Sequence, residues 1–176
     1  KYIITSVCFQ LQKFPHQIKI DYGLIKNQFE QNYLPNIREV AKAVIAIRES
    51  KLPNPKKIGN CGSFFKNPLI SKAHYKLLKQ TYPELPSYPS YDKNVKVPAA
   101  WLIDQLGFKG TRNGDAGVHK NQALVLVNHG KAKGKEILNL AKKIQLKVKE
   151  TFNISLETEV NICLLYTSPS PRDVST

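Results

Sequence analysis

The sequence contains no methionine, only three cysteines, and no long hydrophobic run. The longest apolar runs, such as residues 123–127, are far shorter than the about 20 residues that a membrane-spanning helix needs. Cys8, Cys61 and Cys163 form no CxxC pair and have no histidine at ligand spacing. This pattern argues against a disulfide framework and against a zinc site. We therefore expect a cytoplasmic protein with no metal and no membrane segment.

Acidic residues are also few, with 13 Asp and Glu against 27 Lys and Arg, so the net charge is +14. Such an excess suggests an anionic partner. The lysines are spread along the chain, however, and no RNP, KH or zinc-finger pattern accompanies them. We expect a lysine-rich solvated surface from which a few lysines contact a small anionic ligand, and no nucleic-acid binding. The alternative is a stand-alone basic module that binds nucleic acid or another polyanion.

Both ends of the sequence are unusual for a domain. It begins within an alternating, strand-like pattern and shows no export signal, so we expect further residues upstream. The stretch CLLYTSPSPRD, residues 163–173, resembles one translated reading frame of a sequencing adapter. An ordinary disordered tail is the alternative. We expect the authentic sequence to end near Ile162 and residues 163–176 to be disordered and without function.

Hydrophobic periodicity between these ends predicts a mixture of strands and helices without the regular alternation of a doubly wound sheet, which favours the α+β class. The longest predicted helix, residues 135–152, has one apolar stripe with lysines opposite. The other expected elements are strands at 2–11 and 17–21, a helix from Asn36 that Pro53 stops, a helix at 71–80, an ordered loop at 82–94, a helix at 97–107, and strands at 123–128 and 155–162.

The stretch GNCGSFFKNP, residues 59–68, combines features that rarely occur together. Two glycines and a proline disfavour a buried strand, whereas two phenylalanines are rare in a surface loop. We expect a tight turn, anchored by Phe64 and Phe65, that holds Ser63 near a polar partner. The simpler interpretation is a turn serine that hydrogen-bonds its own backbone.

Six motifs resemble, in order and spacing, the C-terminal part of the bacterial UDP-N-acetylenolpyruvoylglucosamine reductase family. They are KLPNPK, GNCGSFFKNP, SYPSYD, AAWLIDQLGFKG, AGVHKNQALVLVN and LETEV. The resemblance runs over residues 2–162, and the tyrosine loop is similar to that of the family's first subtype. It implies that residues 1–24 are the end of an FAD-binding domain and residues 25–162 a substrate-binding domain.

The resemblance implies a flavin-dependent oxidoreductase. With NADPH as the electron source and FAD as the carrier, it would reduce the enolpyruvyl ether of a UDP-sugar to make UDP-N-acetylmuramate for peptidoglycan. The full-length enzyme would be a monomer. The family holds FAD mostly in an N-terminal domain and has a catalytic arginine in a YR motif, neither of which occurs in this sequence. We therefore expect the chain alone to be inactive.

The resemblance also implies site residues. Ser63 would donate a proton to the substrate carbon, and Glu159 would stabilise the enolate-like intermediate, since both groups suit general-acid and electrostatic catalysis. Glu157, two residues earlier, would share the face of Glu159. The aromatic residues beside Ser63 suit a site without water. His119 fits a structural role better, and the implied substrate contacts are Lys51, Asn67, Gln122, Tyr22 and the loop residue Tyr88.

Overall fold

The computed structural model describes residues 3–21, 23–88 and 94–163. The chain divides into two compact units, residues 1–51 and residues 52–176. The boundary we expect from the resemblance, between residues 24 and 25, is a different division and stays a prediction. Within the described ranges, no helix is long and apolar enough to cross a membrane.

The first unit contains a short 3-10 helix, η1 (Lys26–Gln28), and the helix α1 (Ile37–Lys51). α1 begins at a capping box. The side chain of Asn36 accepts hydrogen bonds from two backbone N–H groups, and Glu39 accepts one from the N–H of Asn36 at 2.8 Å. The predicted helix is thus confirmed, and it ends before Pro53.

The strands predicted at residues 2–11 and 17–21 are wrong over the described residues 3–21, which have no strand assignment. A strand needs a partner for its backbone N–H and C=O groups, and the described part of the chain gives this segment none. Most of its apolar side chains are exposed; Ile3, for example, is 91% exposed.

The second unit is built on an antiparallel sheet in the order β1-β6-β5-β4. Its strands are β1 (Gly59–Ser63), β4 (Arg112–Asn113), β5 (Ala116–Val118) and β6 (Val125–Asn128). A second, two-stranded sheet pairs β2 (Leu69–Ser71) with β3 (Asn94–Lys96). The predicted strand at 123–128 corresponds to β6, whereas the other short strands were not predicted.

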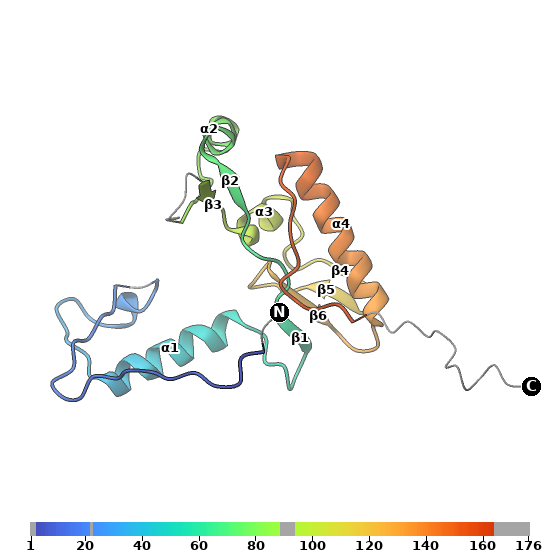
Figure 1. Cartoon of the computed structure of the whole chain (residues 1–176). Helices are drawn as coiled ribbons and strands as arrows, with labels where there is room; N and C mark the ends of the chain where they lie inside the picture. The colour runs from blue at the N-terminus through green and yellow to red at the C-terminus, as the bar shows by residue number, and fades with distance from the viewer. Residues whose placement is uncertain (1–2, 22, 89–93, 164–176) are drawn as a thin grey trace, which may run out of the picture. The chain divides into compact units, whose positions relative to one another are not determined.

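Three helices complete this unit: α2 (Lys72–Thr81), α3 (Ala99–Gln105) and α4 (Gly134–Phe152). All three were predicted. Figure 1 shows α4 along the sheet, where it contacts β5 and β6. The expected apolar stripe of α4 is buried, and Val148 and Ile144 are fully covered. Helices and antiparallel sheets therefore share one core, and the fold is α+β.

Residues 59–63 form a strand, β1, and not the tight turn that the sequence predicts. The glycines are tolerated because β1 is an exposed edge strand with a β-bulge. Between Asn60 and Ser63 the strand has one more residue than its partner. Gly62 takes up this extra residue with a φ of +74°, and its N–H donates to the Asn60 side chain at 3.1 Å.

The final strand predicted at residues 155–162 is also wrong. This segment makes only an isolated bridge, between Thr158 and Phe65, and then bends. The apolar residues at and just before its start are nevertheless covered, since Ile154 is 2% and Leu156 5% exposed, whereas Ile162 at its end is 44% exposed. The start of the alternation thus reports burial against the core without a continuous hydrogen-bonded ladder.

The tyrosine-rich loop predicted at 82–94 is described at residues 82–88 and at residue 94, where β3 begins. Tyr82 packs edge-on against Trp101, with ring centroids 5.9 Å apart, and at 5.1 Å from Phe152. The first tyrosine of the loop therefore belongs to an aromatic cluster that joins α3 to the end of α4. Residues 89–93, and the tail after residue 163, lie outside the described residues.

Candidate active site

Phe64 lies between two neighbouring segments of the second unit and fixes the backbone around the candidate site. Its N–H donates to the carbonyl of Leu124 at 2.8 Å, and its carbonyl accepts from the N–H of Glu159 at 2.9 Å. The end of β1 is thus held between the segment that leads into β6 and the segment around residue 158. Ser63 and Glu159, 96 positions apart in the sequence, consequently lie on adjacent stretches of backbone.

Ser63 is the last residue of β1 and is exposed. Its Cα lies opposite that of Val125 in the ladder. Among the described residues, none hydrogen-bonds to the Ser63 hydroxyl, so the interpretation as a turn serine bonded to its own backbone is wrong. The hydroxyl is available to a ligand.

The two phenylalanines after Ser63 anchor it as predicted. Phe64 is 4% and Phe65 1% exposed, and their rings meet edge-to-face with centroids 5.1 Å apart. Both rings belong to the core, so they hold the backbone of Ser63 but do not cover its hydroxyl. Exclusion of water from this serine must therefore come from a bound ligand or from other residues.

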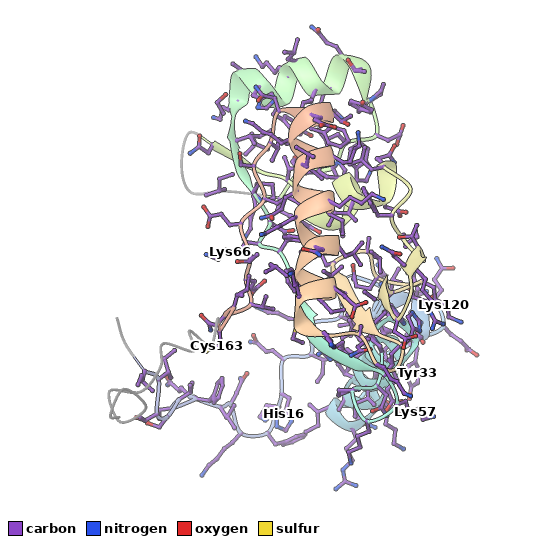
Figure 2. All side chains as sticks on the ribbon, turned by 90° about the vertical axis from the view of Figure 1, so that its right-hand side faces the viewer. His16, Tyr33, Lys57, Lys66, Lys120 and Cys163 are labelled. Atoms are coloured by element: carbon purple, nitrogen blue, oxygen red, sulfur yellow. The ribbon has the colours of Figure 1, made fainter. Side chains whose placement is uncertain are left out.

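The two acids of the terminal segment have different surroundings. Glu157 forms an ion pair with Lys66 at 3.2 Å, between side chains that are 77% and 57% exposed; Lys66 can be found in Figure 2. Such an exposed pair contributes little stability. The Glu159 carboxylate has no hydrogen-bond or ion-pair partner in the described part of the chain. Of the two acids, Glu159 is the one whose carboxylate is free to act on a ligand.

Asn67 has a structural role that the sequence did not indicate. Its side-chain oxygen accepts a hydrogen bond from the N–H of Ala99 at 2.9 Å, at the start of α3. Pro98, the residue in the N-cap position, has no side-chain group to do this. Asn67 therefore caps α3 across 32 residues of sequence, and its amide nitrogen remains for a substrate contact.

We expect Asn67→Ala to lower the free energy of unfolding by about 1 kcal/mol, the usual cost of losing a helix cap. Asn67→Asp keeps the accepting oxygen and should retain most of that stability. Urea unfolding followed by circular dichroism measures both changes. If the alanine variant is as stable as the parent chain, the bond to Ala99 does not stabilise α3.

The other expected substrate contacts lie in different parts of the chain. Gln122, in the turn before β6, accepts a long hydrogen bond from the N–H of Leu124 at 3.4 Å. Tyr88 is 52% exposed, and its N–H donates to the carbonyl of Lys96 at 2.9 Å. Lys51 ends α1 in the first unit, and Tyr22 lies outside the described residues. The second unit thus supplies Ser63, Glu159, Asn67, Gln122 and Tyr88.

His119 is held in a turn close to the end of β5. Its backbone N–H donates to the carbonyl of Val125 at 2.9 Å, and ring Nδ1 accepts a weak bond from the N–H of Asn121 at 3.4 Å. Burial, together with the charges of Lys120 and His129, lowers the pKa of His119. These contacts fit the predicted structural role.

The first turn of each α-helix in the described part of the chain is capped by a polar side chain. Asn36, Ser71 and Asn67 each accept a hydrogen bond from an N–H group in the first turn of α1, α2 and α3, and at α4 the side chain of Glu136 accepts one from the N–H of Lys133. Within the described ranges, no group of three or more His, Cys, Asp or Glu side chains could hold a metal ion.

Comparison with known proteins agrees with the motif pattern. Residues 54–163 match the family model described as UDP-N-acetylenolpyruvoylglucosamine reductase, C-terminal domain. The relative from Flavobacterium johnsoniae, named UDP-N-acetylenolpyruvoylglucosamine reductase, is 53% identical over 164 residues, which are 92% of this chain and 49% of the relative. The relative of the same name from Chromobacterium violaceum is 48% identical over 159 residues, 89% of this chain and 46% of its own length. The chain thus spans about half the length of the curated relatives it matches.

A solved structure was also matched, the crystal structure of the reductase from Thermus caldophilus. It is 28% identical, with a TM-score of 0.43, and the match covers 71% of this chain and 33% of that one.

Proposed function

Because the chain belongs to the UDP-N-acetylenolpyruvoylglucosamine reductase family and matches its C-terminal domain, we propose that it forms the substrate side of such a reductase. The reaction is the reduction of the enolpyruvyl ether of UDP-N-acetylglucosamine to UDP-N-acetylmuramate, for peptidoglycan. NADPH and FAD would supply the hydride, and the resemblance to the family puts most of the FAD site in an N-terminal domain. We also propose a monomeric, cytoplasmic enzyme with residues 25–162 as its substrate-binding domain.

The chemistry of the substrate gives Ser63 and Glu159 their roles. Addition of a hydride to one alkene carbon leaves negative charge on the neighbouring carbon and on the carboxylate next to it. Ser63 would donate its hydroxyl proton to that carbon, and Glu159 would help to stabilise the enolate-like intermediate. A serine is a weak acid, so it must touch a strongly basic carbon from which water is excluded.

One observation carries this assignment. Phe64 directly follows Ser63, and its carbonyl accepts a hydrogen bond from the N–H of Glu159 at 2.9 Å, so the backbones of Ser63 and Glu159 lie side by side. The buried ring pair of Phe64 and Phe65 supports this stretch of backbone. Lys51, Asn67, Gln122, Tyr22 and Tyr88 are the substrate contacts we propose on motif matching.

A chimeric enzyme tests the proposed function. The segment of the Flavobacterium johnsoniae reductase that this chain matches would be replaced by residues 1–162, and NADPH oxidation would be followed at 340 nm with and without the enolpyruvyl UDP-sugar. We expect NADPH consumption that depends on that substrate. A chimera that folds and retains FAD but consumes NADPH at the same rate with and without substrate would disprove the proposal.

A further inference from the structure

A hollow of about 290 Å³ lies between α4 and the segment that leads from α3 into β4. Its apolar floor is made by Phe108 and Leu140, which are 9% and 8% exposed. Polar side chains form its walls, with Asn139 and Lys143 one helical turn apart on α4 and Arg112 and Asn113 on β4. An apolar floor with a few polar groups around it is the usual construction of a small-ligand site.

The charges of this hollow favour an anion. Arg112 and Lys143 line it, and no carboxylate does. Asp115 is the acid paired with Arg112, and it is bonded on both oxygens: to the guanidinium at 2.6 Å and to the N–H of Lys131 at 2.8 Å. The Arg112 Nε also donates to the carbonyl of Gly114 at 2.6 Å. The charge of Arg112 is therefore already met by Asp115, which leaves Lys143 as the cation that a ligand in the hollow would contact.

Three donor side chains around the hollow have no partner within the described residues. They are the amides of Asn113 and Asn139 and the ammonium group of Lys143. Thr111, also in the wall, donates its hydroxyl to the carbonyl of Phe108 at 2.7 Å and keeps its own oxygen as an acceptor. The hollow thus offers several unbonded donors next to an apolar surface.

The hollow is separate from the proposed active site. Ser63 lies on β1, at one edge of the sheet, and Arg112 lies on β4, at the other edge. Two strands, β6 and β5, intervene, and at about 4.8 Å per strand spacing the two edges are about 14 Å apart. A ligand in the hollow would therefore not contact Ser63.

We propose that this hollow binds a small organic anion, namely a carboxylate carried on a short apolar body. The carboxylate contacts Lys143 and the amides of Asn113 and Asn139, and the body lies on Phe108 and Leu140. A hollow of about 290 Å³ suits a single-ring acid and is too small for a nucleotide sugar. The inference is independent of the proposed function.

Titration of the ¹⁵N-labelled chain with sodium benzoate, at constant ionic strength, tests the site. We expect saturable shifts confined to the backbone amides of residues 111–113 and 139–143. Lys143→Gln should weaken benzoate binding about threefold to tenfold, as removal of a partly exposed charge–charge contact does. Lys149→Gln, which removes the same charge from α4 outside the hollow, should leave the affinity unchanged.

Benzyl alcohol, the neutral counterpart of benzoate, separates charge recognition from simple apolar packing. It should give no saturable shift at these amides. Three outcomes would overturn the proposal: no saturation with benzoate, an equal effect of Lys143→Gln and Lys149→Gln, or binding of benzyl alcohol as tight as that of benzoate. Spectra of the unliganded variants show whether each one is folded, so an altered fold cannot be taken for lost binding.

Discussion

In a full-length reductase that carries this domain, we expect Ser63→Ala to slow the reoxidation of reduced flavin by the enolpyruvyl substrate by ~10⁴-fold or more. This is the upper end of the cost of losing a general acid, because no water replaces the serine at a carbon centre. Reduction of the flavin by NADPH should keep its rate, since Ser63 takes no part in it. Rapid mixing, followed by the absorbance of the flavin, resolves the two half-reactions.

The cysteine variant of the same position provides the matched control. A thiol is a stronger acid than a serine hydroxyl and has a similar size, so Ser63→Cys should recover part of the lost rate. The proton-donor role is refuted if the alanine variant reoxidises its flavin at the rate of the parent enzyme. Equal losses in both half-reactions would instead point to a damaged fold.

Phe65→Ala should have the largest effect on stability. The side chain is 1% exposed, and it packs edge-on against Phe64 beneath the candidate site. Truncating a buried phenylalanine removes its apolar contacts and leaves a cavity, which costs about 3–5 kcal/mol. Urea unfolding of the chain measures this loss.

An exposed apolar residue serves as the comparison for Phe65. Leu77, on α2, is 63% exposed, so Leu77→Ala should change the free energy of unfolding by less than about 0.5 kcal/mol. Similar losses in the two variants would contradict the burial of Phe65 described above.

The helices were the part of this fold that the sequence predicted well. α1 and α4 are long enough for their apolar periodicity to repeat several times, and their ends carry local signals such as Asn36 and Pro53. These signals depend only on residues a few positions apart, so they can be identified without knowing the partners in space.

The strands were predicted less well, because a strand is defined by a neighbour that the local sequence does not contain. The strands predicted at residues 2–11 and 17–21 have no ladder over the described residues 3–21. Conversely, β1 contains two glycines, which argued against a strand, and the bulge that makes them acceptable is visible only against β6. The pair Asn60 and Gly62 was the one local sign of that bulge.

The candidate site shows the same division. The sequence indicated Ser63 and Glu159 through motifs. The structure adds that the residue after Ser63, Phe64, accepts a backbone hydrogen bond from Glu159. The sequence could not indicate that Asn67 caps a helix that starts 32 residues later, since nothing near Asn67 in the sequence predicts that it lies next to α3. Long-range hydrogen bonds of this kind are set by the tertiary fold.

Because β1 contains an extra residue, the orientation of the Ser63 side chain depends on the number of residues that precede it in the strand. Successive side chains of a strand point to opposite faces, so one residue more or fewer before Ser63 would reverse the side of the sheet on which its hydroxyl emerges. Cys61 can therefore vary in identity more safely than the number of residues in the bulge can vary, whereas Gly62 is also restricted by its φ of +74°. In engineering this domain, a single-residue deletion in β1 would be more damaging than substitutions at several of its positions.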